Sequence, residues 1–124
     1  MGNGEKVILK IRKGNLCFPH DYSVSNGDSL YLTQNAFSPF SIALYTKEQW
    51  ISVRESLVDT ATSTGGVSGD LIRQVLANAV ECIVEECEIN IPSHLLKLAD
   101  LKNEALWIQG ETRVELWDPE RYAK

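Results

Sequence analysis

The chain has 124 residues, of which 44% are hydrophobic and 23% are charged, and its formal net charge is −5 at pH 7. These values are typical of one globular domain that can bury a core without a metal or a disulfide. No apolar run is long enough to span a membrane and the N-terminus is unlike a signal peptide, so we expect a cytoplasmic protein. Its cysteines, Cys17, Cys82 and Cys87, are then expected to be reduced thiols.

The first part of the chain predicts a β-hairpin followed by a second pair of strands. Residues 7–11 are rich in β-branched side chains, residues 12–15 contain the Gly and Asn of a tight turn, and Pro19 ends the return strand. About one helical turn is expected at residues 20–24. Strands are then predicted at residues 29–33 and 42–45, and Pro39 disfavours a strand in the connection between them.

A helix is predicted to start after Thr46, a favourable N-cap, and to end near residue 57. Residues 59–69 are rich in Thr, Ser and Gly, which predicts a flexible linker. The second part predicts a helix, two strands about a turn, a further helix and a final hairpin: residues 70–78, 79–84, 87–91, 93–101, 105–109 and 112–117. Asp118 and Pro119 favour a last helical turn.

The same order of elements occurs twice, which predicts an internal duplication. Pro19 lies 73 positions before Pro92, and Tyr45 lies 72 positions before Trp117. Two landmarks with nearly one offset indicate one domain made of two repeats, residues 7–58 and 70–122, joined by the linker at 59–69.

No pattern typical of an enzyme, a metal site or a cofactor site is present in the sequence. His20 and His94 are expected to face solvent, and the tryptophans are expected to pack in the core. The acidic residues Glu85, Glu86 and Glu88 are most simply a solvated turn. We therefore expect a protein that is not an enzyme and that binds no cofactor.

The hairpin tip at residues 10–15 is the one candidate binding site. Lys10, Arg12 and Lys13 are the basic residues there, and Gly14 and Asn15 complete the turn. Such a tip can present cations to phosphates or to base edges in a groove of DNA. A solvated hairpin tip with no partner is an equally good interpretation of these residues alone.

The chain resembles the MraZ family of bacterial proteins, whose halves belong to the AbrB-like (SpoVT-AbrB) swapped-hairpin group. The resemblance is specific in the second half. It rests on residues 79–82 (Ala-Val-Glu-Cys), 89–92 (Ile-Asn-Ile-Pro), Leu95, 99–101 (Ala-Asp-Leu) and 114–122, the closing segment around Trp117-Asp118-Pro119-Glu120-Arg121. The first half is similar more loosely, at residues 13–14, 16, 18–22 and 45–50.

The resemblance implies a mainly β, α+β fold: two hairpin-and-helix halves in a pseudo-two-fold swapped-hairpin barrel. It also implies a ring-like homo-oligomer and a DNA-binding transcriptional regulator, located in the cytoplasm or at the nucleoid. The DNA implied is the promoter region of a cell-division and cell-wall gene cluster.

The family's DNA-reading turn, Asp-x-x-Gly-Arg, is not kept here. Ile11 and Asn15 replace its Asp and Arg in the first half. In the second half Glu85 is assigned to the Asp position, Cys87 replaces the Gly and Glu88 replaces the Arg. Because Glu opposes phosphate, an alternative is an oligomeric interaction or scaffold protein that kept the fold and lost DNA binding.

Overall fold

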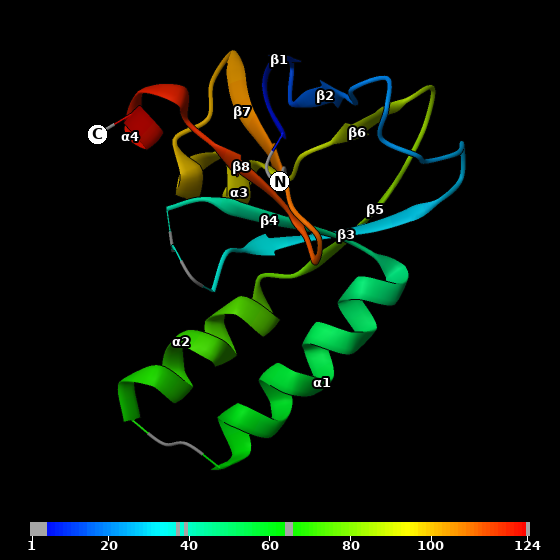
Figure 1. Cartoon of the computed structure of the whole chain (residues 1–124). Helices are drawn as coiled ribbons and strands as arrows, with labels where there is room; N and C mark the ends of the chain where they lie inside the picture. The colour runs from blue at the N-terminus through cyan, green and yellow to red at the C-terminus, as the bar shows by residue number, and fades with distance from the viewer. Residues whose placement is uncertain (1–4, 37, 39, 64–65, 124) are drawn as a thin grey trace.

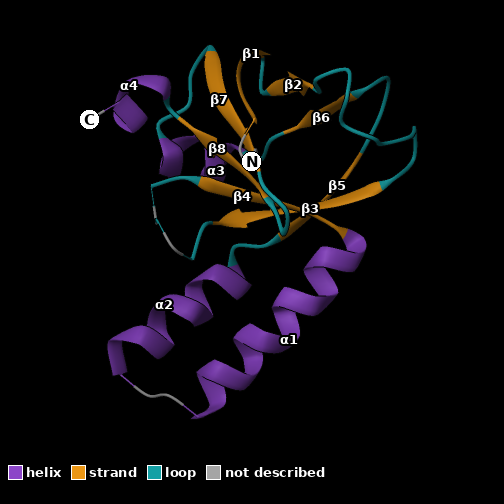
Figure 2. Ribbon diagram, in the orientation of Figure 1, coloured by secondary structure: helices purple, strands orange, loops and turns teal. Residues whose placement is uncertain are grey.

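The computed structural model describes residues 5–36, 38, 40–63 and 66–123. Its strands form one sheet that curls into a nearly closed barrel, with a pair of longer helices projecting from one side (Figures 1 and 2). The strands are β1 Glu5–Arg12, β2 Asn15–Cys17, β3 Ser29–Gln34, β4 Ile42–Thr46, β5 Val80–Ile83, β6 Glu88–Asn90, β7 Glu104–Gln109 and β8 Val114–Trp117. The helices are α1 Lys47–Ser63, α2 Gly66–Ala77, α3 Ser93–Ala99 and α4 Pro119–Ala123.

The two halves of the chain exchange their hairpins. Strand order is β5-β3-β4-β8-β7-β1-β2-β6, and every described pairing is antiparallel. Strand β1 of the first half pairs with β7 of the second, and β5 of the second half pairs with β3 of the first. Exchanging the halves reproduces this order around the barrel. The predicted fold class, an α+β pseudo-two-fold swapped-hairpin barrel, is therefore confirmed.

Reciprocal hydrogen bonds show the same symmetry at the level of single residues. The Ile91 amide donates to the Gly14 carbonyl at 2.8 Å, and the Phe18 amide donates to the Cys87 carbonyl at 3.0 Å. Phe18 and Ile91 are 73 positions apart, as are Gly14 and Cys87. Between the two bonds, Leu16 faces Ile89 across β2 and β6. We call residues related by this offset equivalent.

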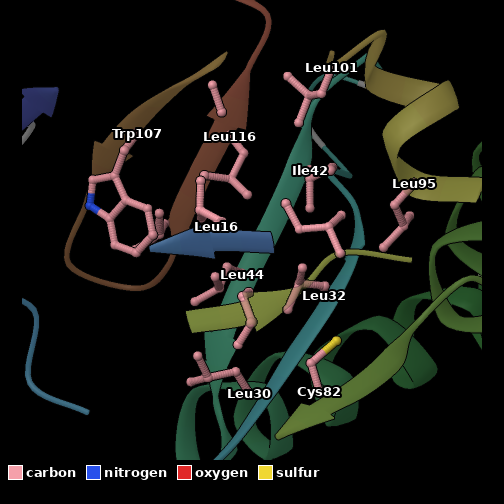
Figure 3. Close-up of a cluster of buried hydrophobic side chains, with 14 of the residues drawn as sticks. Leu16, Leu30, Leu32, Ile42, Leu44, Cys82, Leu95, Leu101, Trp107 and Leu116 are labelled. Atoms are coloured by element: carbon pink, nitrogen blue, oxygen red, sulfur yellow. The ribbon is translucent and has the colours of Figure 1, made fainter. Parts of the chain in front are cut away.

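The barrel interior is filled by large aliphatic side chains from both halves (Figure 3). Leu16, Leu32, Ile42, Leu44 and Leu116 are completely buried. Trp107 closes one side of this core, where it contacts Tyr22 edge-to-face with ring centroids 4.9 Å apart. Burial raises the pKa of the Tyr22 phenol to about 12. Apolar burial of this kind is the main stabilising contribution, and here both halves supply it jointly.

Helix α1 begins where the sequence predicts but continues further. The Gln49 amide donates to Thr46 Oγ1 at 3.2 Å, and the Thr46 amide donates to Gln49 Oε1 at 3.0 Å, which completes a capping box. Its first turns pack on the outside of the barrel, where Trp50 stacks on Tyr31 with centroids 5.9 Å apart.

The prediction of a flexible linker at residues 59–69 is wrong for most of that segment. Helix α1 extends to Ser63 and α2 starts at Gly66, and residues 64–65 lie outside the described part. The two helices lie side by side (Figure 1). Hydroxyl side chains are tolerated in α1 because they can bond the preceding turn, as Thr60 Oγ1 does to the Ser56 carbonyl at 2.9 Å.

Residues 20–24 form a turn rather than the predicted helical turn. The Tyr22 amide bonds the Pro19 carbonyl at 3.1 Å, the equivalent of the Leu95 to Pro92 bond that begins α3, but no helix follows. The chain instead enters a loop in which the Ser25 amide donates to Asp28 Oδ2 at 2.8 Å. Pro39, predicted to disfavour a strand, lies outside the described residues. None of the described helices is long and apolar enough to cross a lipid bilayer.

Candidate nucleic-acid interface

The basic tip, residues 10–15, is the turn of the β1–β2 hairpin. Lys13 and Gly14 both have positive φ, 54° and 83°, which is the geometry of the tight turn favoured between twisted strands. Arg12 and Asn15 are the last paired residues before it. The β1–β2 hairpin lies at the end of the barrel away from α1 and α2 (Figure 1). The sequence predicted this turn correctly.

The cations of the basic tip are exposed and free of ion pairs. Lys10, Arg12 and Lys13 are all exposed, whereas Ile11 between them is 4% exposed and points into the core. No acidic side chain lies within ion-pair distance of any of the three in the described part of the chain. Unpaired surface cations can bind a phosphate. Arg12 and Lys13 are adjacent at the turn, so both can reach the same DNA backbone.

The other two predicted site residues hold the tip in place. Asn15 Oδ1 accepts a hydrogen bond of 2.9 Å from Asn90 Nδ2, its cross-strand partner. The Gly14 carbonyl accepts the Ile91 amide. A Cβ at Gly14 would lie 3.4 Å from Asn90 Nδ2, an ordinary contact, so the positive φ and not the available space favours glycine at this position. Gly14 and Asn15 therefore anchor the turn to β6.

The sequence did not predict one basic residue that lies beside the basic tip. Lys102, from the loop after α3, lines the same surface groove as Lys10 and Arg12. Nothing in the sequence places residue 102 beside residue 10, because the pairing of β1 with β7 sets their proximity. The groove is not purely basic. Lys102 lies 3.6 Å from Asp100, Glu104 faces Lys10 across the strands, and Asp118 and Glu120 complete the lining.

The equivalent turn of the β5–β6 hairpin has the same backbone and the opposite charge. Glu86 and Cys87 have φ values of 53° and 65°, close to those of Lys13 and Gly14. We call residues 85–88 the acidic tip. Its glutamates Glu85, Glu86 and Glu88 are exposed, as predicted for a solvated turn. One molecule therefore presents one basic and one acidic version of a single turn.

The structural register corrects one residue assignment. Ile11 and Val84 are equivalent, since their amides make matching bonds to the carbonyls of Asn103 and Asp28, at 2.8 and 2.9 Å. Val84, not Glu85, therefore occupies the second Asp position of the family's turn. Both positions hold buried apolar side chains, 4% and 1% exposed, so neither turn carries that carboxylate.

His20 and His94 are exposed, as expected, and Trp50 and Trp107 are buried, whereas Trp117 is half-buried. All three cysteines are free. The described residues contain no group of three or more His, Cys, Asp or Glu side chains able to hold a metal.

Comparison with known proteins finds relatives of one name that match most of the chain. A transcriptional regulator MraZ of Caldanaerobacter subterraneus is 31% identical over 97% of this chain and 81% of the relative. The transcriptional regulator MraZ of Thermoanaerobacter pseudethanolicus is 30% identical with the same coverage. The protein of that name from Geotalea uraniireducens is 25% identical over 83% of this chain and 66% of the relative. No family model matches the chain.

Proposed function

Because the chain belongs to the MraZ family, we propose that it is a transcriptional regulator that binds DNA through the basic tip. The observation that carries this proposal is the set of exposed, unpaired cations at Lys10, Arg12 and Lys13. Arg12 and Lys13 would contact phosphates, and the groove beside them would add Lys102. The protein would then act in the cytoplasm, at the nucleoid.

The DNA that we propose is the promoter region of the cell-division and cell-wall gene cluster implied by the family resemblance. One basic tip supplies few phosphate contacts, so one copy would bind weakly. A ring-like homo-oligomer would repeat the contact and supply the missing affinity through avidity. Exposed apolar side chains, among them Ile8 at 53% and Ile51 at 50%, are surface that such an assembly could cover.

The same proposal extends to the origin of the fold. We propose that the chain is one domain of two repeats, residues 7–58 and 70–122, in which the scaffold was kept and the two tips diverged. The equivalent hydrogen bonds at Gly14 and Cys87 support it, as do the two capped helix starts at Thr46 and Asp118.

Binding to DNA upstream of the protein's own operon, followed by fluorescence anisotropy at several salt concentrations, tests the proposal. We expect affinity that falls steeply with salt. The double variant Arg12→Gln, Lys13→Gln should bind about tenfold or more weakly and reduce the salt slope by about 2, one unit for each lost phosphate contact.

The pseudo-symmetry of the molecule provides a matched control. Glu85 and Glu86 are equivalent to Arg12 and Lys13, so Glu85→Gln, Glu86→Gln neutralises the two matching positions of the acidic tip, with the opposite change in net charge. This variant should bind DNA as tightly as the parent or more tightly. Equal weakening by both double variants, or no binding by the parent even at low salt, would exclude the basic tip as the DNA contact.

A second candidate function is an assembly that kept the fold and lost DNA binding. The specific observations in its favour are Glu88 at the acidic tip and Asn15, whose side chain is engaged by Asn90 at 2.9 Å. Under this alternative, the variant Asn15→Arg, Glu88→Arg gains DNA affinity that the parent lacks. Parent protein that already binds as tightly as the variant would rule it out.

A further inference from the structure

We propose that Cys17 and Cys87 form a redox-active dithiol that oxidises to a reversible disulfide. The bond would tie β2 of the first half to the acidic tip of the second half. Both thiols are exposed and free, and they come from parts of the sequence separated by the whole of α1 and α2.

The strand register brings the two cysteines together. Cys17 faces Glu88 across β2 and β6, and the next pair is Phe18 with Cys87, whose backbone hydrogen bond is 3.0 Å. Cys17 and Cys87 are thus diagonal neighbours. Regular strand geometry, with adjacent strands about 4.8 Å apart and a rise of about 3.3 Å per residue, would place two such Cα atoms about 6 Å apart. A disulfide spans Cα separations of roughly 4.4–6.8 Å.

The direction of the Cys87 side chain follows from the equivalent position in the first half. A Cβ built at Gly14 would lie 3.4 Å from the side-chain nitrogen of Asn90 and 3.6 Å from the Ile91 carbonyl oxygen. The equivalents of Gly14, Asn90 and Ile91 are Cys87, Cys17 and Phe18. With the same backbone conformation, the Cβ of Cys87 is therefore directed at the Cys17 side chain and the Phe18 carbonyl.

The Cys17 thiol also lies near the Phe18 carbonyl group. Its Sγ lies 3.9 Å from the Phe18 carbonyl oxygen, toward which the Cys87 Cβ is directed. The two side chains thus converge from opposite strands on one carbonyl group. In a regular strand Cys87 would point away from the face of Cys17 and Glu88, but its positive φ of 65° directs its Cβ as at Gly14. The bond then needs side-chain rotation and an adjustment of the turn.

The third cysteine is set apart from the pair. Cys82 is 8% exposed and belongs to the barrel core. Burial, with the negative charge of Glu81, raises the pKa of its thiol to about 11. Because the thiolate is the reactive form, Cys82 should stay reduced under conditions that oxidise an exposed pair.

The oxidant required is a hydroperoxide. One thiolate attacks a peroxide oxygen and becomes a sulfenic acid, while the other oxygen leaves as water or an alcohol. The second thiolate attacks the sulfenic sulfur, forms the S–S bond and expels the hydroxyl group, which leaves as water. Two electrons pass from the thiols to the peroxide, and the two thiol protons leave with the oxygens. A dithiol reductant restores both thiols.

Peptide mapping of the full chain after mild hydrogen peroxide treatment tests the proposal. The expected product is a chain that has lost two hydrogens and is not covalently linked to another chain, with the Cys17 and Cys87 peptides joined and Cys82 free. Dithiothreitol should reverse it. The Cys82→Ser variant should form the same link, and Cys17→Ser and Cys87→Ser should each abolish it.

An equal mixture of isotopically labelled and unlabelled chains separates links within one chain from links between chains. Joined peptides of mixed label would overturn the proposal. So would Cys17 and Cys87 carrying separate sulfinic or sulfonic acids with no joined peptide. The oxidised wild-type chain should also unfold at a higher temperature than the reduced chain, and the Cys17→Ser chain should show no such shift.

Discussion

At the scale of single residues, the two hairpin tips place different side chains on one backbone geometry. Cys87, at φ 65°, occupies the turn position that Gly14 occupies in the other hairpin, at φ 83°. A residue with a Cβ is strained by roughly 1–2 kcal/mol in this conformation, and glycine is not. Cys87 therefore makes the second turn less stable than a glycine at the same position would.

We expect Cys87→Gly to stabilise the reduced protein by about 0.5–1 kcal/mol, because relief of the backbone strain exceeds the entropy lost with glycine. Urea unfolding in the presence of a reductant measures the change. The mirror variant Gly14→Ala should destabilise the protein by about 1 kcal/mol, since a residue with a Cβ is strained at φ 83°. A destabilised Cys87→Gly protein would contradict this account.

Glu115 is held in the barrel wall by several hydrogen bonds. Arg113 donates to its Oε2 from Nη2 at 2.7 Å, and Trp117 Nε1 donates to its Oε1 at 2.9 Å. Burial raises the pKa of this carboxyl, but hydrogen bonds from Trp117, Arg113 and Asn35 together outweigh burial and lower it. The charged form is therefore the one that the fold stabilises.

This lowered pKa predicts acid sensitivity. A carboxyl whose pKa is lower in the folded state contributes stability above its unfolded pKa, about 4.3, and loses it as the pH falls from there through the folded pKa. Glu115→Gln should cost about 2 kcal/mol at pH 7 and progressively less below about pH 4. Thermal unfolding of both proteins from pH 7 to pH 3 measures this. A constant difference would show that Glu115 does not titrate differently in the two states.

At the scale of elements, both halves of the chain start a helix with a side-chain cap directly after their last strand. Thr46 caps α1, and Asp118 Oδ2 accepts the Arg121 amide at 3.1 Å in α4. The two helices nevertheless have very different lengths, Lys47–Ser63 and Pro119–Ala123. The cap thus sets where each helix begins and leaves its length to packing, which for α1 includes Trp50 on Tyr31.

Removing the α1 cap should destabilise the protein. We expect Thr46→Ala to lower the free energy of unfolding by about 1 kcal/mol, because the Gln49 amide loses its acceptor. Thr46→Ser keeps the hydroxyl and should lose little. Chemical unfolding of the three proteins provides the comparison, and equal stability of all three would show that the bond contributes nothing.

Local sequence patterns predicted the positions of the strands well, but they did not predict which strands pair with each other. Alternation and turn residues located the strands of both hairpins, and the basic tip formed where Gly14 indicated. The pairing of β1 with β7 depends on contacts between residues about 100 positions apart, for which the sequence contains no local signal. The position of Lys102 beside Lys10 and the contact of Asn15 with Asn90 follow from that pairing, so sequence reasoning missed both. The composition of residues 59–69 predicted a linker, but most of this segment belongs to α1 and α2, which pack against each other.

At the scale of the whole molecule, neither half contains a complete sheet. Without the second half, β1 lacks β7 and β3 lacks β5, and the interior loses Trp107 and Leu116. Residues 1–62 alone should therefore be unfolded as a monomer by circular dichroism. Mixing them with residues 66–124 should restore the β signal. A cooperatively folded monomer of residues 1–62 would show that the exchange of hairpins is dispensable.

The exchange of hairpins also delays strand pairing during synthesis on the ribosome. Strand β1 ends at Arg12 and its partner β7 ends at Gln109, so about 100 residues are synthesised between the two strands. At roughly 5–20 residues per second, β1 waits about 5–20 s for that partner. Throughout this interval its β-branched edge is open to pairing with another nascent chain. The barrel therefore closes only after β7 has been synthesised, and closely spaced ribosomes on one message bring such unpaired strands together.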